Sequence, residues 1–423
     1  MHIIGIELHD NNFSGLDLSH PERGNPGIGG SEYLFVMLAA YLKKYFCDKY
    51  AVRIYHYSEN KLPEGTESVI VSSEGDIVER LKTDGTEVFI HHVNRDLNWY
   101  EKIKETDVAD IPWAHNYIHY PEVRAIVSCE NVKRVIFVGR EEYDSYMDDD
   151  IMEKSAFIFN MMNTAECLGE REKDYGKNVT YVGSLVPAKN FHLLAKVWPE
   201  ISSRVPDAGL KVIGTGKLYS RNAGLGKYGI AESDYEESFM RYLTDDEGNI
   251  LKSVEFCGLL DNEGRKKIFR DTAVGVVNPA AADETFCLSA VEMELHGIPV
   301  VSRRKHGLLD TVSHGRSGFL FKNEKEFVDD VVKLLNDRKL NDEMGRNARD
   351  IFRDRFEAAD IIKEWSRNLD EVIAGEKPVY VKPAGNHSND GKWVRMIIRT
   401  LRFGLGLRFI PSVCAMKYKI KGV

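Results

Sequence analysis

Short runs of β-branched and aromatic residues alternate with longer segments of helical period along most of the chain, and after one interruption the alternation starts again. Parallel strands need long connections, so strands separated by helices are typical of a parallel sheet covered by crossover helices. An α/β fold with doubly wound sheets is therefore predicted. In the first stretch the predicted strands are 3–8, 52–57, 69–72, 88–92, 111–116, 135–138 and 156–159.

The second stretch repeats the pattern after a polar, charged segment. Its predicted strands are 179–185, 210–213, 254–257, 273–277, 298–302 and 318–321. The polar segment 216–252 is too long for an ordinary connection, so we expect a partly helical insertion or an active-site flap there. The predicted organisation is a first domain at 1–165, a linker at 166–178, a second domain at 179–358, a helix at 359–380 that can return to the first domain, and a tail at 386–423.

Composition limits the class of protein. The 423 residues are 43% hydrophobic and 29% charged, which is typical of a globular chain and argues against collagen-like and disordered classes. Acidic side chains outnumber basic ones, 66 to 57, so no nucleic-acid partner is expected. Six scattered cysteines without a CxxC pair and the lack of an apolar run of about 18 residues predict a cytoplasmic chain without a transmembrane helix.

The tail differs from the body in charge. Between 386 and 423 there are eight Lys or Arg side chains and one acidic side chain. Within 392–405, Arg395, Arg399 and Arg402 share one helical face, and apolar side chains share the opposite face. This pattern predicts an amphipathic basic helix that lies on an anionic membrane through 392–421. The alternatives are a helix docked on the body and an oligomer contact.

A glycine-rich turn, GIGGSE at 27–32, comes just before a predicted helix. Glycines let a backbone approach a phosphate closely, and a helix N-terminus adds unsatisfied N–H groups and a partial positive charge. The turn does not match GxGxxG, so by itself it is equally consistent with the plain start of a helix.

A second motif, ADETFCLSAVE at 282–292, follows the predicted strand 273–277. Glu284 falls in the loop between strand and helix, and Glu292 falls in the second turn of the helix. Open α/β sheets bind ligands at this edge, where two carboxylates can accept hydrogen bonds from sugar hydroxyls and backbone N–H groups can meet a diphosphate. The alternative is a surface helix with incidental acids.

These segments together resemble the retaining family 4 glycosyltransferases of the GT-B fold. The resemblance rests on the E-x7-E pair Glu284/Glu292, Asn278-Pro279, GIPVV at 297–301, YVGSLVPAKNFHLLAKVW at 181–198 and the Gly29-Gly30 turn, and it extends from residue 1 to about residue 374. It implies two Rossmann-like doubly wound domains that face each other across a cleft, followed by the C-terminal amphipathic tail. The first would be the acceptor-side domain and the second the nucleotide-sugar-binding domain.

The family implies a role for each matching residue. Glu292 is expected to bind the ribose hydroxyls of a nucleotide sugar, Glu284 the hydroxyls of the donor sugar, and Lys189 the diphosphate. Gly29 is expected to offer its amide to the phosphates from the opposing domain. The other predicted donor-binding residues are Gly30, Ser184, Thr285, Phe286, Cys287 and Leu288.

Three positions depart from the usual family pattern. Ser184 stands where many members carry an arginine, so one expected phosphate cation is missing, and the cationic run 303–305 could replace it. Thr285 and Cys287 replace glycines, which narrows the space for backbone approach to the donor.

Histidines and an acidic run complete the candidates. The family places a functional histidine beside the donor sugar; His115 matches that position best, with His119 second. The predicted catalytic residues are therefore His115, Glu284 and Lys189. Asp148–Asp150 contain a DxD, the metal motif of another glycosyltransferase fold, but they follow a predicted helix, so we expect a solvated acidic loop and neither a metal nor another cofactor.

The predicted function is transfer of a sugar, with retention of anomeric configuration, from a UDP- or GDP-sugar to a glycan or lipid-linked acceptor. Cell-surface polysaccharide or glycoconjugate synthesis, at the cytoplasmic face of a membrane, would suit it. Two alternatives stay open: a non-catalytic glycan-binding or scaffold subunit that keeps the fold, and a sugar-nucleotide epimerase of the same architecture.

Overall fold

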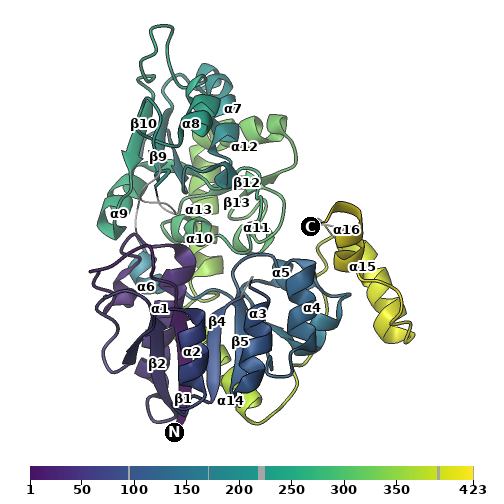
Figure 1. The fold of residues 1–423 in the computed structure, drawn as a ribbon. Coiled ribbons are helices and arrows are strands. Elements are labelled where there is room, and N and C mark those ends of the chain that lie inside the picture. Colours follow the sequence, from purple (N-terminus) through teal and green to yellow (C-terminus); the bar gives the residue numbers. More distant parts are fainter. Residues whose placement is uncertain (94–95, 170, 218–223, 388–390, 423) are drawn as a thin grey trace. The chain divides into compact units, whose positions relative to one another are not determined.

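A computed structural model describes residues 1–423 except 94–95, 170, 218–223, 388–390 and 423. The chain forms two compact units, each built on its own parallel sheet (Figure 1). Unit 1 consists of Met1–Pro21, Ser31–Met161 and Ala358–Val423. Unit 2 consists of Glu22–Gly30 and Met162–Glu357.

The sheet of unit 1 has seven strands in the order β3-β2-β1-β4-β5-β6-β7, and its described pairs are parallel. The chain starts in the interior and builds outward in one direction and then the other, which is the doubly wound arrangement. Every strand predicted for this half is formed. The strands are β1 His2–Leu8, β2 Tyr50–His56, β3 Glu67–Ile70, β4 Val88–His92, β5 Ala109–Ala114, β6 Val135–Phe137 and β7 Ser155–Phe157.

Helices connect these strands. Helix α1 shows why they form, because its apolar side chains at positions i, i+3, i+4, i+7 and i+8 are buried: Leu34, Met37, Leu38, Tyr41 and Leu42. The helices are α1 Gly30–Phe46, α2 Glu74–Leu81, α3 Asn98–Lys102, α4 Tyr120–Ser128 and α5 Arg140–Asp144, with short 3-10 turns at η1 Pro21–Arg23, η2 Ile103–Glu105 and η3 Asp150–Lys154.

Helix α14 (Ala358–Ile373) belongs to unit 1 although it follows unit 2 in the sequence. The ring of Trp365 packs edge-on against Trp113, with centroids 4.7 Å apart. The guanidinium of Arg134, a residue that is 1% exposed, lies 2.9 Å from the Glu371 carboxylate. The helix predicted at 359–380 ends earlier, at Ile373. Its contacts with Trp113 and Arg134 show that it packs on the first half of the chain.

The tail also belongs to unit 1. It forms α15 Lys392–Arg399, a π-helical turn η5 Thr400–Gly404 and α16 Val413–Lys421, drawn in yellow in Figure 1. The rings of Tyr120 in α4 and Tyr418 in α16 lie 5.3 Å apart, so α16 contacts α4 directly.

The basic face of α15 points into unit 1. Lys392 Nζ lies 3.0 Å from Glu141 Oε1 and 2.9 Å from Asp144 Oδ2, and these side chains are at most 3% exposed. Arg395 pairs with Asp148 at 3.1 Å, with side chains 6% and 0% exposed. Buried charges are tolerated when they are paired, as here. The prediction that this basic face lies on an anionic membrane is therefore wrong, and the alternative of docking on protein holds for it.

The expectation of a solvated loop at Asp148–Asp150 is also wrong. Arg402 and Arg408 pair with Asp150 at 2.7 and 2.8 Å, and Ser412 Oγ donates to Asp149. The sequence pattern did not predict these contacts, because Arg402 comes 252 residues after Asp150. We call these tail contacts with residues 141–153 the tail dock. Over the described part of the chain, no group of three or more His, Cys, Asp or Glu side chains could hold a metal ion.

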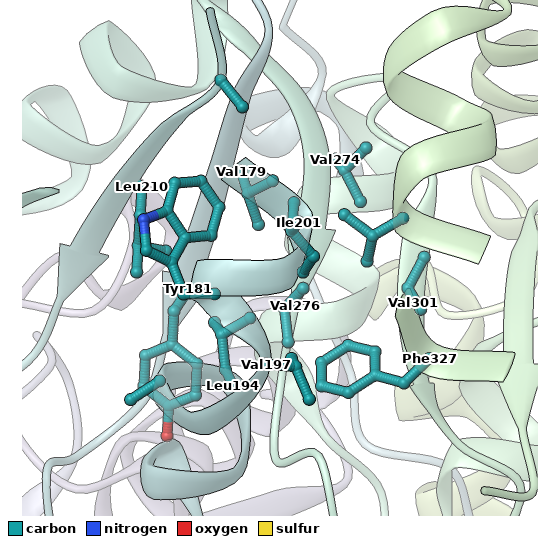
Figure 2. Close-up of a cluster of buried hydrophobic side chains, with 14 of the residues drawn as sticks. Val179, Tyr181, Leu194, Val197, Ile201, Leu210, Val274, Val276, Val301 and Phe327 are labelled. Carbon is teal, nitrogen blue, oxygen red and sulfur yellow. The ribbon is translucent and has the colours of Figure 1, made fainter. Parts of the chain in front are cut away.

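The sheet of unit 2 has six parallel strands in the order β10-β9-β8-β11-β12-β13. Figure 2 shows its core, where side chains of four strands pack against helices α7 and α12, for example Val179, Val276, Ile201 and Phe327. Every strand predicted for this half is formed. The strands are β8 Asn178–Val182, β9 Gly209–Ile213, β10 Val254–Gly258, β11 Thr272–Val276, β12 Val300–Arg303 and β13 Gly318–Phe321.

The predicted insertion at 216–252 and the predicted linker at 166–178 both lie in unit 2. Helix α8 makes the insertion partly helical, although 218–223 lie outside the described residues. In the predicted linker, the Arg171 guanidinium lies 4.1 Å from the centroid of the Tyr175 ring and donates to Asn341 over 2.6 Å, so the linker packs on unit 2. The helices are α6 Thr164–Cys167, α7 Phe191–Arg204, α8 Ser233–Met240, α9 Asn262–Arg270, α10 Leu288–Leu295, α11 Leu308–Thr311, α12 Glu324–Asn336 and α13 Arg338–Phe352, with the 3-10 turn η4 Pro187–Lys189. Among the described helices of the whole chain, none combines the length and apolar character needed to cross a bilayer.

Candidate functional site

The loop between β11 and α10 carries several of the predicted site residues in a constrained backbone. Four of its non-glycine residues have positive φ angles: Asn278, Ala281, Asp283 and Cys287. Such angles are costly for side chains with a Cβ, so surrounding contacts must hold them. Gly307 provides one, because its N–H donates to the Glu284 carbonyl oxygen over 2.8 Å, and a Cβ at 307 would overlap the Thr285 carbonyl.

Glu284 is held by a cation and an amide. Its Oε2 lies 2.8 Å from Lys189 Nζ and accepts a 2.9 Å hydrogen bond from Asn278 Nδ2. Lys189 closes the turn after β8 and Asn278 follows β11, so two paired strands bring these side chains together. The lysine side chain is 27% exposed and the glutamate side chain 12%, so solvent still reaches the pair.

The charge state of Glu284 follows from these contacts. Burial by itself would raise the pKa of Glu284, but the Lys189 ammonium and the hydrogen bonds from Asn278 and Lys189 outweigh it and hold the pKa below its ordinary value of 4.5. At neutral pH the site therefore offers a carboxylate, which accepts hydrogen bonds from hydroxyls, beside an ammonium, which attracts anions.

Glu292 lies in the second turn of α10, as predicted, and is paired with Arg265 of α9. Arg265 Nε lies 2.9 Å from Glu292 Oε1, and its Nη1 donates to the Leu260 carbonyl oxygen over 3.0 Å. The two side chains are 13% and 14% exposed. Arg265 thus ties the carboxylate to the loop between β10 and α9. The sequence analysis missed this residue, because it lies 27 positions from its partner and in no motif.

Ser184 turns its hydroxyl toward the backbone. It is 4% exposed, and its Oγ donates to the Thr215 carbonyl oxygen over 3.1 Å, which joins the loops after β8 and β9. The guanidinium of Arg303 lies 5.8 Å from the centroid of the Phe321 ring on β13. Replacement of the missing arginine by the run 303–305 stays a prediction.

The residues that lead into α10 are packed tightly. Thr285, Phe286 and Cys287 are buried, and the Phe286 ring meets the Phe356 ring edge-on at 4.9 Å. Burial raises the pKa of Cys287 to about 12, so it remains a thiol. Leu288 begins the helix, whose N-terminal amides and partial positive charge therefore lie next in sequence to the Glu284 loop.

Residues 27–30 of the glycine-rich turn belong to unit 2 by their contacts, and Ser31 and Glu32 belong to unit 1. Asn25 Oδ1 accepts the N–H of Gly27 over 2.8 Å, which shapes the turn, and Gly29 precedes α1. A Cβ at Gly30 would lie 3.4 Å from Leu288 Cδ1, the first residue of α10. The predicted approach of the Gly29 amide to the phosphates from the opposing domain stays a prediction.

His115 lies in unit 1, directly after β5, and His119 precedes α4. The His115 ring is 4.4 Å from the Trp113 ring and 5.6 Å from the His92 ring. Burial lowers the pKa of His115 to about 3 and that of His92 well below 6.5, so both imidazoles are neutral at pH 7. The predicted place of His115 beside a donor sugar stays a prediction.

The second half of the chain is similar to proteins of a known family. Residues 169–351 match the family model described as Glycosyl transferases group 1. The chain is 27% identical over 202 residues to a D-inositol 3-phosphate glycosyltransferase of Corynebacterium glutamicum, which covers 47% of this chain and 44% of that protein. It is 27% identical over 189 residues to the capsular polysaccharide biosynthesis glycosyltransferase CapM of Staphylococcus aureus, 44% of either chain. The chain therefore matches less than half the length of these curated relatives.

Solved structures resemble more of the chain. A sucrose-phosphate synthase of Thermosynechococcus elongatus has a TM-score of 0.69 over 89% of this chain and 100% of that chain, at 15% identity. Anabaena HepE, solved with UDP and glucose, has a TM-score of 0.64 over 88% of this chain and 100% of that chain, at 14% identity. These likenesses show the fold and confirm the predicted class, the GT-B fold with two Rossmann-like sheets.

Proposed function

Because residues 169–351 match the family model described as Glycosyl transferases group 1, we propose that this chain is a retaining, metal-independent glycosyltransferase with a nucleotide-sugar donor. The observation that carries the proposal is a set of two contacts in unit 2, Glu284 with Lys189 and Glu292 with Arg265, which we call the site pairs. Their side chains are between 12% and 27% exposed, so each pair can open toward a ligand.

The diphosphate is the part of the donor that needs positive charge. Glycosyl transfer passes through an oxocarbenium-like state in which the leaving nucleoside diphosphate gains negative charge. In our proposal Lys189 turns from Glu284 to this diphosphate, and the N-terminal amides of α10 and of the Gly29-Gly30 turn add hydrogen bonds. Cations and dipoles aimed at the leaving group stabilise it without a metal ion.

In the same proposal the donor sugar and the ribose bind the two carboxylates that the cations release. Glu284, released by Lys189, accepts hydrogen bonds from donor-sugar hydroxyls, and Glu292, released by Arg265, accepts those of the ribose. The bond between the anomeric carbon and the phosphate oxygen breaks while the acceptor oxygen bonds to the same face of the sugar. The acceptor proton passes to the leaving phosphate oxygen, so the configuration is retained. His115 is proposed to lie beside the donor sugar as a neutral hydrogen-bonding group.

Donor and acceptor classes are part of the same proposal. Anabaena HepE was solved with UDP and glucose, which supports a UDP-sugar, with a GDP-sugar as the alternative. The name of the CapM relative supports a glycan or lipid-linked acceptor in polysaccharide or glycoconjugate synthesis. We propose that the chain works at the cytoplasmic face of a membrane and meets it through 392–421.

The test is release of nucleoside diphosphate from a panel of UDP-, GDP- and ADP-sugars, each offered with glycan and lipid-linked acceptors. We expect release with at least one donor, and we expect Glu292→Ala to abolish it while the circular dichroism spectrum and melting temperature stay unchanged. Turnover that survives in a folded Glu292→Ala variant would refute the site. Silence with every donor and acceptor would instead favour a scaffold subunit, and epimerised donor without transfer would favour an epimerase.

A further inference from the structure

Large exposed apolar side chains gather in the tail. In the described part of the tail seven of them are exposed: Trp393, Met396, Ile397, Leu405, Phe409, Tyr418 and Ile420. Trp393 is 58% exposed and Phe409 83%. These residues come from α15, α16 and the turn between the two helices, so the whole tail, rather than one position, presents apolar groups to the surroundings. Large apolar side chains exposed in such number within one segment of a folded protein commonly mark a contact site.

The cations between 392 and 402 are turned the other way. Lys392, Arg395 and Arg402 are at most 6% exposed in the tail dock. Arg399 donates to the Met147 carbonyl oxygen over 2.6 Å, and its guanidinium lies 3.4 Å from the centroid of the Tyr380 ring. Residues 393, 396 and 397 stand between these positions in the helical period and lie on the outward face. The dock therefore fixes which face of α15 points out, and it is the apolar one.

The chemistry of the outward face fits a lipid surface better than a protein partner. The tail has no acidic side chain from 391 to 423, and Lys419 on α16 is exposed. Lysines are depleted from the cores of protein interfaces, whereas at a bilayer their ammonium groups reach lipid phosphates. Trp and Tyr are enriched at the boundary between headgroups and acyl chains. Aromatic, aliphatic and lysine side chains without carboxylates thus complement that boundary.

We propose that the tail binds a lipid bilayer by inserting this apolar face, while the tail dock keeps its basic face on the protein. This inference rests on the proposed work at a membrane and specifies how the chain meets it. Because four of the tail's eight cations, Lys392, Arg395, Arg402 and Arg408, are paired with carboxylates of unit 1, we expect burial of apolar area to supply most of the binding, without a requirement for anionic lipid. The ion pairs hold the two helices in a fixed orientation on unit 1.

Sedimentation of the full chain with vesicles tests this. We expect binding to pure phosphatidylcholine vesicles, with less than about a twofold change when phosphatidylserine is added or when salt is raised to about 0.5 M. The triple variant Trp393→Ser, Ile397→Ser, Phe409→Ser should lose at least about tenfold in partition coefficient. The matched control is Ile70→Ser in β3, an isoleucine 52% exposed against 53% for Ile397, which should bind like the wild type.

Two results would overturn the inference. Binding only to vesicles with phosphatidylserine, abolished by salt, would mean that the tail dock opens and that the basic face of the tail binds the anionic lipid. No sedimentation with either vesicle, or a dimer in analytical ultracentrifugation that the triple variant dissociates, would assign the apolar face to another occupant. Donor turnover with a water-soluble acceptor is read separately: a chain that turns over donor but ignores vesicles refutes only the lipid contact, and the reverse result refutes only the proposed transfer.

Discussion

The site pairs of unit 2 and the tail dock of unit 1 are both sets of cation–carboxylate contacts, and distance does not distinguish them. Lys189 lies 2.8 Å from its glutamate, and Lys392 lies 2.9 and 3.0 Å from its two carboxylates. Burial does distinguish them, since the Lys189 side chain is 27% exposed and the Lys392 side chain 2%. A part-exposed cation can exchange its partner for water or a ligand, whereas a buried one cannot leave without stranding charges.

The difference teaches how one kind of contact serves two purposes. In unit 2 Lys189 can exchange its carboxylate for a ligand phosphate, and Glu284 and Glu292 can exchange their cations for ligand hydroxyls. In unit 1 the same chemistry acts as a permanent attachment for the C-terminal helices. If this reading is correct, removing a lysine should impair activity in one region and local stability in the other.

The largest expected effect is on the tail. Lys392→Met removes the ammonium that pairs with the buried carboxylates of Glu141 and Asp144 and leaves Asp144 its contact with Arg140 at 3.2 Å, which should cost about 3–5 kcal/mol of docking free energy. We expect amides of 392–421 to lose protection in hydrogen exchange, while donor turnover with a water-soluble acceptor is unchanged. Lys419→Met, at an exposed position of α16, is the control and should keep full protection. Tail amides that remain protected in Lys392→Met would show that the dock is not what holds these helices.

Lys189→Met should show the opposite pattern. Loss of the cation proposed for the leaving diphosphate should lower kcat about 10²–10³-fold, whereas the free energy of unfolding should change by less than about 1 kcal/mol because the pair is part-exposed. Nucleoside diphosphate release and urea denaturation measure the two. Lys196→Met in α7 removes another part-exposed, ion-paired lysine, 2.6 Å from Glu324, and should leave kcat unchanged. A kcat within about threefold of wild type in Lys189→Met would contradict the assignment.

Buried histidines of unit 1 predict how stability depends on pH. The folded-state pKa of His115 is about 3, below the ordinary 6.5, so on acidification the unfolded chain takes up a proton first. The free energy of unfolding should therefore fall by up to about 1.4 kcal/mol per pH unit as pH drops from 6.5 toward 3. Between pH 7 and pH 5, His115→Asn should lose about 2 kcal/mol less than wild type in urea denaturation. Identical pH slopes for the two proteins would contradict the lowered pKa.

Arg265→Met should have the smallest effect. Before the donor binds, Arg265 holds Glu292 and the Leu260 carbonyl in place and does not touch the reacting atoms. Without Arg265 the donor must itself order the Glu292 side chain, so we expect the donor KM to rise about 5–10-fold with kcat within about twofold. Arg265→Lys keeps the charge near Glu292 and should recover part of this loss. A fall in kcat at constant KM, or no change in either constant, would mean that Arg265 does not position the ribose-binding carboxylate.

Local sequence patterns were sufficient for the framework and for part of the site. Most strands of the two sheets appear as short apolar runs, as in β1 and β11, because a strand buried on both faces needs continuous apolar side chains. Glu284 and Glu292 were placed correctly in the loop and in the second turn of α10, since a strand, a loop and a helix in succession fix that geometry. Lys189 was found through its segment rather than through any visible partner.

Contacts between distant segments were not predictable in the same way. The amphipathic period of α15 showed which side chains share a face, but not which face points inward, and the deciding carboxylates lie about 250 residues earlier. Asp148–Asp150 looked like a solvated run for the same reason. Arg265 gave no signal, because a single arginine on a charged helix is ordinary until its neighbour is known.

A crystal structure of the full chain with bound UDP tests the central claim most directly. The account predicts Lys189 Nζ within about 3 Å of a diphosphate oxygen, and it predicts Glu292 on the ribose hydroxyls instead of on Arg265. Lys392 should remain on Glu141 and Asp144 as it is now. UDP bound elsewhere, with both site pairs still closed, would contradict the account.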